Sequence, residues 1–356
     1  MADLSDPSEI RVYTDGCYDL VHYGHANSLR QAKQLGTYLV SGAHSEEQIK
    51  FHKGPPLSKE VERFDQLRAI RWVNEVMERA PYQITPEVLD KINCKFTVHG
   101  NDISPLAGGA DCYSIVKDAK RYREVQRTEG VSTTELVERL LQESKAHHLA
   151  SFNGEDIDVN NWKWVPELCT DANAIDPCVE VFYYRSAGLK KVISGIGPKP
   201  GQKICYTYGS FDLFHHGHVQ FLKKAHQLGD YVIVGILNDQ TVNSYKGGSY
   251  PILNILERLR SLVSCRYVDA AVIDVPYKLN GDILDFFKPD VVVHGVNLSE
   301  DFLEKDPYQL AKDRGILKIL SSGSTLTSTD LMARIVENRV AYVERNKRKL
   351  KKGDAK

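Results

Sequence analysis

The chain has 356 residues, of which 42% are hydrophobic and 26% charged, and its formal net charge is −1. This length suits about two domains of roughly 150 residues each. The nearly balanced charge argues against nucleic acid or a membrane surface as a partner. No run of about 18 apolar residues and no apolar stretch behind a basic N-terminus occurs, so we expect neither a membrane span nor a signal peptide.

Strands and helices alternate along the first part of the chain. Apolar patterns predict strands over residues 10–14, 38–43, 72–76 and 96–100. Helical spacing predicts a helix from His25, one capped by Ser58, and two more over 86–91 and 132–141. We expect a loop at 52–56 and a charged connection over 122–134. Such alternation is typical of a doubly wound α/β unit with a parallel sheet.

The same order of elements returns in the second half. Strands are predicted over 231–237 and 291–295, residues 266–269 match 71–74, and 245–247 form the loop. Between the halves lies an irregular stretch with two tryptophans and several prolines, which we expect to be an ordered linker. The sequence thus predicts four parts, at residues 10–143, 144–200 (linker), 201–340 and 341–356 (basic tail).

The seven cysteines are scattered, and they favour a reduced, cytoplasmic protein. No two of them form a Cys-x-x-Cys motif, and their number is odd. Disulfide frameworks and zinc sites need paired or closely spaced cysteines. We therefore expect no metal site built on cysteine.

A His-x-Gly-His motif stands where the first predicted strand turns into a helix. His22 and His25 lie three residues apart, and Gly24 leaves room for a ligand. A strand–turn–helix junction presents free backbone N–H groups and the positive end of the helix, which favour a phosphate. Both imidazoles can donate hydrogen bonds to one phosphoryl group at this position.

The motif occurs a second time, in the second half. His215 and His218 follow the first pair at a constant offset of 193 positions. The offset holds without a gap through to Lys53, which corresponds to Lys246. A lysine on a loop is usually a solvated charge, but this repetition favours contact with phosphate. The repeat makes chance an untenable explanation of the histidine pair.

A third phosphate-binding feature follows the fourth predicted strand. Arg127 precedes a turn at Gly130, and Ser132 and Thr133 open a helix. Hydroxyl and helix N–H groups donate to phosphate oxygens, and the guanidinium adds a planar cation.

These two motifs, in this order, resemble those of the cytidylyltransferase family of the nucleotidyltransferase superfamily. Segments 53–54, 71–75 and 99–102 fit the same family. The resemblance covers both halves and leaves only the linker and the tail outside it. It implies two tandem Rossmann-like nucleotidyltransferase domains, each built on a doubly wound parallel sheet.

The tandem arrangement implies transfer of CMP from CTP to phosphoethanolamine, giving CDP-ethanolamine and pyrophosphate, in phosphatidylethanolamine synthesis. Family members that act on phosphocholine have one such unit followed by a long amphipathic membrane helix, which is not evident here. The attacking phosphate is largely dianionic, because its second pKa is about 6, so no general base is required. Mg²⁺ is implied, and without a dedicated carboxylate cage we expect it to ride on the phosphates of CTP.

The resemblance assigns roles to residues of the first half. The residues implied in catalysis are His22, His25, Lys53 and Arg127. Those implied in CTP binding are Cys17, Tyr18, His22, His25, Arg127, Thr128, Gly130, Ser132 and Thr133. The candidates for acceptor binding are Trp72, His99 and Asp102. Trp72 is as readily a core residue, and Asp102 as readily a turn former.

The two halves are not equivalent in sequence. Ser322 stands where Arg127 does, Thr325 where Gly130 does, and residues 296–297 replace the exit at 101–102. We therefore expect turnover in the first half and nucleotide binding without turnover in the second. That second site is expected to include Ser210, Phe211, His215, His218, Lys246, His294, Gly295, Ser322, Gly323, Ser324, Thr325 and Leu326.

Several alternatives stay open on the sequence. The acceptor could be phosphocholine or glycerol 3-phosphate. A quaternary amine needs an aromatic cage, whereas a primary ammonium needs hydrogen-bond acceptors, and the sequence does not distinguish the two kinds of site. An adenylyltransferase of the same superfamily is disfavoured by the motif at 127–134. A nucleotide-binding scaffold or sensor is the alternative of another class, most plausible for the second half. For the oligomeric state, a homodimer is one option. For the location, we expect the cytoplasm, with peripheral attachment at the endoplasmic reticulum surface as an option.

Overall fold

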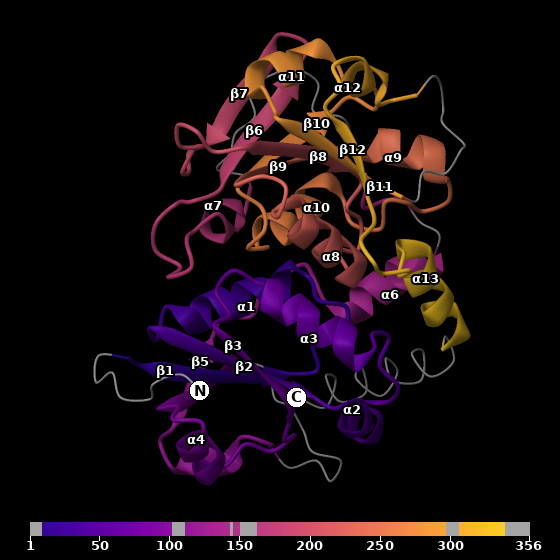
Figure 1. Cartoon of the computed structure of the whole chain (residues 1–356). Coiled ribbons are helices and arrows are strands. Elements are labelled where there is room, and N and C mark those ends of the chain that lie inside the picture. The colour runs from indigo at the N-terminus through magenta and orange to yellow at the C-terminus, as the bar shows by residue number, and fades with distance from the viewer. Residues whose placement is uncertain (1–8, 102–110, 143–144, 150–161, 297–305, 339–356) are drawn as a thin grey trace. The chain divides into compact units, whose positions relative to one another are not determined.

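The computed structural model describes residues 9–101, 111–142, 145–149, 162–296 and 306–338. The chain divides into two compact units. Unit 1 comprises Met1–Val137, Ala172–Ile175 and Thr329–Lys356, and unit 2 comprises Glu138–Asp171 and Asp176–Ser328. Each unit is built around its own sheet (Figure 1).

Unit 1 contains a five-stranded sheet in the order β3-β2-β1-β4-β5, with all neighbours parallel. Its strands are β1 (Arg11–Gly16), β2 (Tyr38–His44), β3 (Glu75–Ala80), β4 (Phe96–Gly100) and β5 (Tyr122–Val125). Its helices include α1 (Tyr23–Lys33), α2 (Glu46–Lys53), α3 (Glu60–Ala69), α4 (Pro86–Lys91) and α5 (Ser114–Asp118). Helix α6 (Thr133–Gln142) begins in this unit.

Helices cover both faces of this sheet, with α1 and α3 on one face and α4 on the other (Figure 1). On the α4 side, Tyr13 and Val40 of the sheet pack with Leu89 and Val116 in one buried cluster. A parallel sheet covered on both faces gives the doubly wound class that the alternation predicts. In such sheets ligands bind outside the carboxyl ends of the strands, where the order reverses, and β1 lies at that point.

Unit 2 repeats this arrangement and adds two strands. Its sheet has the order β12-β11-β8-β9-β10-β6-β7. The repeated strands are β8 (Ile204–Gly209), β9 (Tyr231–Leu237), β10 (Ala270–Val275), β11 (Val291–Gly295) and β12 (Leu317–Leu320). Its helices are α7 (Val165–Leu168), α8 (His216–Ala225), α9 (Asp239–Lys246), α10 (Ile255–Val263), α11 (Gly281–Phe287) and α12 (Gln309–Asp313). Helix α13 (Ser328–Glu337) follows them in the chain and belongs to unit 1 from Thr329 onward.

The two added strands lie inside the stretch expected to be a linker. β6 (Glu180–Arg185) pairs parallel to β10, and β7 (Gly188–Ile193) pairs antiparallel to β6. The side chain of Glu180 is buried and accepts a hydrogen bond of 2.9 Å from the Tyr231 hydroxyl. A charged residue at the start of a buried strand obscures the apolar pattern. The periodicity of the sequence therefore does not predict these two strands.

Three local predictions are wrong in detail. The third strand begins at Glu75, and Trp72 precedes it in a turn. Residues 122–125, expected to be a connection, form the edge strand β5. Ser58 does not cap helix α3, whose N-cap is Lys59. The backbone N–H of Ser58 instead donates to the carboxylate of Asp19 at 2.8 Å.

Lys53 and Lys246 are each the last residue of a helix, and not loop residues as expected. Helix α2 starts at the N-cap Ser45, which is reciprocally hydrogen-bonded with Gln48, and ends because Gly54 adopts a φ of +93°. Only glycine takes such a conformation without strain. The Gly-Pro-Pro that follows looks like a loop in sequence, but the helix runs up to it. A helix end holds the lysine more firmly than a loop would.

Candidate active site

The histidine pair of the first repeat forms the N-terminus of helix α1. His22 is the N-cap, and its Nδ1 accepts from the backbone N–H of Gly24 at 3.1 Å. The backbone N–H of His22 donates in turn to Nδ1 of His25 at 3.3 Å. The ring centroids lie 4.0 Å apart. The two side chains therefore cap the helix and fix each other's orientation.

This arrangement decides which nitrogen of each ring can meet a ligand. Because Nδ1 accepts from the backbone in both rings, a neutral imidazole carries its proton on Nε2. Burial, and after it the charges of His25 and Arg127, hold the pKa of His22 well below its usual value. His22 is thus neutral at pH 7, with an Nε2–H that can donate. The pair presents two fixed N–H donors beside the positive end of a helix dipole.

The glycine of the motif lets the second motif approach. A Cβ on Gly24 would come within 2.8 Å of Val131 Cγ1 and 2.9 Å of the His22 ring. Any larger residue would push apart the histidines and the segment that follows β5. The hydroxyl of Tyr23 donates to the carbonyl of Gly130 at 3.2 Å across the same contact. The structure thus brings the two phosphate motifs together.

Two further hydrogen bonds tie the loops of the site to the turn after β1. The hydroxyl of Thr133 donates to the carbonyl of Asp19 at 3.0 Å. The Asp19 carboxylate, which is 6% exposed, accepts from the backbone N–H groups of Leu57 and Ser58. A buried carboxylate is stabilised by such N–H donors. Asp19 therefore joins the loop after Lys53 to the histidine motif.

The other residues predicted to bind the nucleotide lie around these motifs. Arg127 is exposed and close enough to His22 for its positive charge to lower the pKa of His22. Thr128 is buried, and its hydroxyl accepts from the side-chain amide of Asn27 at 2.9 Å. Ser132 accepts from the backbone N–H of Glu135 at 3.1 Å, at the start of α6. The carbonyl of Cys17 accepts from the buried Arg63 at 2.8 Å. Ligand contacts of these residues stay predictions.

The turn after β1 is strained in the same places in both repeats. Tyr18 and Leu20 have φ values of 49°, and Phe211 and Leu213 have values of 47° and 49°. Bulky residues rarely adopt the left-handed region, and such strain is concentrated at functional sites. Tyr18 is buried and lies edge-on to His25, with ring centroids 5.7 Å apart. The ring of Tyr18 therefore packs against the ring of His25.

Asp15 is a candidate that the sequence pattern did not reveal. It lies at the end of β1, is 4% exposed, and accepts from the Tyr113 hydroxyl at 2.9 Å through Oδ1. Its other oxygen, Oδ2, is buried without a hydrogen-bond partner among the described residues and lies 3.8 Å from Nε2 of His44. Burial raises the pKa of Asp15 to about 7, against the opposing effects of Tyr113 and Lys53. A buried carboxylate oxygen of this kind suits a cationic ligand.

Aromatic and basic groups surround Asp15. The ring of His99 lies 4.6 Å from that of Tyr113. Burial holds the pKa of His44 at about 4, so this ring is neutral at pH 7. Lys53, whose charge acts on Asp15, lies with its Nζ 5.9 Å from the centroid of the Tyr82 ring. These groups form a second polar centre near the histidine pair, and we call it the Asp15 pocket: Asp15, His44, Lys53, Tyr82, His99 and Tyr113.

The three residues predicted to bind the acceptor have different positions. His99 belongs to the Asp15 pocket. Trp72 is completely buried before β3, and its part in an amine pocket stays a prediction. Asp102 lies outside the residues that the structure describes. The signal that would have found Asp15 is a carboxylate in an otherwise buried strand, at a position where the second repeat has tyrosine.

The second repeat has the same histidine geometry. His215 is the N-cap of α8, its Nδ1 accepts from Gly217, and its N–H donates to Nδ1 of His218 at 3.3 Å. The ring centroids are 3.9 Å apart. A Cβ on Gly217 would lie 2.7 Å from the carbonyl of Leu326, as Gly24 faces Val131. Both repeats therefore bring their two motifs together in the same way.

The loop between β12 and α13 differs from its counterpart in the first repeat. The hydroxyl of Ser322 donates to the carbonyl of Ser324 at 2.9 Å, and the backbone N–H of Leu326 donates to Oγ of Ser324. Gly323 takes the left-handed conformation, with a φ of +79°. A cation does stand beside this loop, because Lys224 donates to the carbonyl of Ser321 at 2.8 Å. Lys224 belongs to helix α8, whereas Arg127 of the first repeat precedes the turn at Gly130.

No group of three or more His, Cys, Asp and Glu side chains in the described ranges could hold a metal ion. None of the helices that the structure describes is long and apolar enough to cross a membrane.

Comparison with known proteins agrees with both repeats. A cytidylyltransferase-like family model matches residues 13–139 and 206–342. The chain is 44% identical over 374 residues to the ethanolamine-phosphate cytidylyltransferase of Mus musculus, which covers 98% of this chain and 92% of that protein. The relative of the same name from Dictyostelium discoideum is 44% identical, with 98% and 97% covered, and that from Arabidopsis thaliana is 39% identical, with 96% and 83% covered. The chain therefore belongs to the ethanolamine-phosphate cytidylyltransferase family.

Proposed function

We propose that the protein transfers CMP from CTP to phosphoethanolamine, giving CDP-ethanolamine and pyrophosphate, in the synthesis of phosphatidylethanolamine. Similarity to ethanolamine-phosphate cytidylyltransferases along nearly the whole of both chains supports this substrate pair. The structural observation that carries the proposal is the pair of fixed Nε2–H donors of His22 and His25 at the start of α1. These donors stand where a transferred phosphoryl group would meet the helix N-terminus.

The reaction is an in-line displacement at phosphorus. An oxygen of the phosphoethanolamine phosphate attacks the α-phosphorus of CTP, and the bond from that phosphorus to the bridging oxygen breaks. The electron pair leaves with pyrophosphate. Near neutral pH the attacking phosphate is already mainly a dianion, since its second pKa is about 6. The residues therefore position two anions and stabilise developing charge, and none is needed as a base.

The residues of the first repeat divide this work. The Nε2–H groups of His22 and His25 donate to the α-phosphate and the leaving oxygen. Arg127 and Lys53 neutralise phosphate charge. Preorganised donors of this kind cost no reorganisation when charge develops, which makes them effective in catalysis.

The Asp15 pocket is the site proposed for the ethanolamine ammonium group. Oδ2 of Asp15 is a buried acceptor without a hydrogen-bond partner among the described residues, and a primary ammonium supplies three donors. The bound cation would return the pKa of Asp15 from about 7 toward that of an ordinary carboxylate. Phosphocholine offers no N–H donor to this oxygen, so the carboxylate favours the primary amine as acceptor.

Mg²⁺ is proposed to arrive bound to the phosphates of CTP. In enzymes that act on triphosphates, this ion is usually held by the phosphates of the substrate together with one or two carboxylates of the protein. When bound, it would neutralise charge on the β- and γ-phosphates.

For the second repeat we propose nucleotide binding without turnover. His215 and His218 keep the donor geometry, whereas Ser322 stands in place of Arg127. Losing a charge-assisted contact with phosphate costs about 1.5–3 kcal/mol, which weakens handling of a triphosphate more than binding of a cytidine nucleotide. A homodimer and a peripheral location at the endoplasmic reticulum remain predictions from the sequence.

The proposal is tested by measuring pyrophosphate release from CTP with three acceptors in parallel. We expect turnover with phosphoethanolamine to exceed that with phosphocholine and with glycerol 3-phosphate. Equal or faster turnover with either alternative would assign the acceptor differently, and release with none would contradict the enzyme assignment.

A further inference from the structure

The two repeats differ most at the position of Asp15. Its counterpart at the offset of 193 positions is Tyr208. The register of the sheets confirms this equivalence, because Asp15 pairs with Gly42 on β2, and Tyr208 pairs with Gly235 on β9. Gly42 and Gly235 are themselves related by the same offset. A tyrosine side chain therefore starts from the backbone position where the first repeat has its buried carboxylate.

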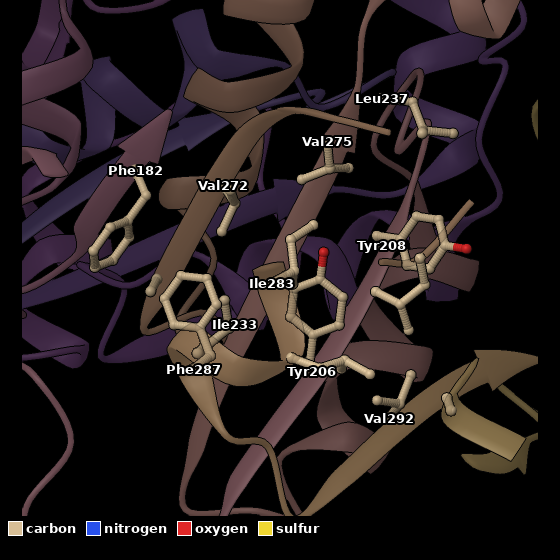
Figure 2. Close-up of a cluster of buried hydrophobic side chains, with 14 of the residues drawn as sticks. Phe182, Tyr206, Tyr208, Ile233, Leu237, Val272, Val275, Ile283, Phe287 and Val292 are labelled. Carbon is tan, nitrogen blue, oxygen red and sulfur yellow. The ribbon is translucent and has the colours of Figure 1, made fainter. Parts of the chain in front are cut away.

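Tyr208 fills the space at the end of its sheet. The side chain is 6% exposed and belongs to a hydrophobic cluster of unit 2 that also includes Leu237 (Figure 2). Its hydroxyl lies 3.0 Å from the carbonyl of Tyr277 and 3.2 Å from that of Pro307. The ring centroid is 5.0 Å from that of Tyr308. Both the volume and the hydrogen-bonding capacity of Tyr208 are thus used within the protein.

The neighbours of Asp15 are replaced in the same direction. His44 becomes Leu237, which is 3% exposed in the same cluster. His52, which stacks on Tyr82 with ring centroids 3.8 Å apart, becomes Tyr245, which packs against that cluster. Tyr308 holds the helix-capping position that Tyr113 holds in the first repeat, with φ values of −101° and −100°. In the first repeat the hydroxyl of this tyrosine donates to a carboxylate, and in the second its ring packs against that of Tyr208 at an interplanar angle of 38°.

An ammonium group would not meet a carboxylate at the position that Asp15 occupies in the first repeat, because Tyr208 stands there. Aromatic rings can hold a cation on their faces, but only when those faces are open to it. Here the rings pack against one another and against aliphatic side chains. Burying an unpaired ammonium among them would cost far more than the contacts return.

We infer that Tyr208 closes the acceptor site of the second repeat, so that each chain binds two nucleotides and one phosphoethanolamine. This inference rests on the proposed function, because it takes the Asp15 pocket as the site of the ammonium group. The nucleotide side of the second repeat is unaffected, since the His215 and His218 geometry matches that of the first. Tyr208 is the residue that separates the two repeats in specificity, more than the change from Arg127 to Ser322.

The stoichiometry of binding tests the inference on the full chain. Radiolabelled phosphoethanolamine is titrated by equilibrium dialysis in the presence of a CTP analogue whose α,β-bridging oxygen is replaced by methylene, which prevents transfer. We expect one phosphoethanolamine per chain. Asp15→Asn should weaken this binding at least tenfold, and the matched change Tyr208→Phe should leave both the number and the affinity unchanged. Binding of the labelled analogue by the same variants shows that they are folded.

Two results would overturn the inference. One is the binding of two phosphoethanolamine molecules per chain, and the other is full binding in Asp15→Asn together with loss in Tyr208→Phe. Pyrophosphate release by the same wild-type preparation separates this failure from that of the proposed function. A preparation that turns over phosphoethanolamine but binds two molecules contradicts the closed second site alone. A preparation without turnover contradicts the assignment of the reaction.

Discussion

The hydroxyl of Tyr113 donates a hydrogen bond of 2.9 Å to Oδ1 of Asp15. The two residues come from helix α5 and strand β1, 98 positions apart. This bond occupies one oxygen of the carboxylate and leaves the other, Oδ2, buried without a hydrogen-bond partner in the described structure, 3.8 Å from Nε2 of His44. A carboxylate held in this way is oriented to accept hydrogen bonds from a cation.

Replacing Asp15 with asparagine should weaken acceptor binding specifically. Removing one charged hydrogen-bond partner costs about 1.5–3 kcal/mol, so we expect KM for phosphoethanolamine to rise roughly 10- to 100-fold. KM for CTP should change little, because the proposed nucleotide contacts lie at the histidine motif. Steady-state kinetics with each substrate varied in turn measure both. A rise in KM for CTP alone would place Asp15 on the nucleotide side.

The pH dependence of acceptor binding follows from the same group. The pKa of Asp15 is raised to about 7, so the carboxylate gains a proton as the pH falls through 7 and loses its attraction for the ammonium. KM for phosphoethanolamine should therefore rise below pH 7, beyond the effect of protonating the substrate phosphate. Asp15→Asn, measured over the same pH range, should retain only the substrate's own dependence. Identical profiles for the two proteins would contradict this role.

The buried carboxylate should also reduce stability at alkaline pH. A folded-state pKa above that of the unfolded chain means that the folded state binds the extra proton. The free energy of unfolding should then fall as the pH rises from about 4 through 7. At pH 8 we expect Asp15→Asn to melt at a higher temperature than the wild type, although it binds the acceptor less well. A lower Tm in the variant would show that the charge is compensated in the folded protein.

The histidines of the first repeat should control the rate of the chemical step. His22→Ala or His25→Ala should lower kcat by about 10²–10³-fold, on the order of 3 kcal/mol for one lost transition-state donor. His22→Asn provides the matched control for stability, because asparagine is a favoured N-cap but lacks the donor at Nε2. We expect this variant to fold normally and remain slow. The corresponding change His218→Ala should act less severely, through stability or coupling.

Arg127 should be essential for the triphosphate. Arg127→Ala should nearly abolish turnover, whereas Arg127→Lys should recover part of it, because the charge returns without the planar fork. The matched position in the second repeat is Ser322, and Ser322→Ala should have a much smaller effect on kcat. Comparable losses at the two positions would mean that both repeats turn over.

Activity should not require lipid. No amphipathic lipid-binding helix is evident in the sequence, so we expect full turnover of the purified protein without vesicles. Strong stimulation by anionic vesicles would show that a segment of the linker or the tail binds membranes.

The architecture follows from the residue pattern alone. The same pattern indicated His22 and His25 as site residues, and their ligand contacts stay predictions. The gapless repeat of 193 positions and the alternation of strands and helices predicted two doubly wound sheets, and the histidine pairs marked the carboxyl end of their first strands. These features are local, since periodicity and helix capping involve neighbouring residues. The tertiary structure alone decided the Asp15 pocket, where β1, α2, β4 and α5 converge. A buried carboxylate becomes a site only when distant residues exclude water from it, as Tyr113 and His44 do here.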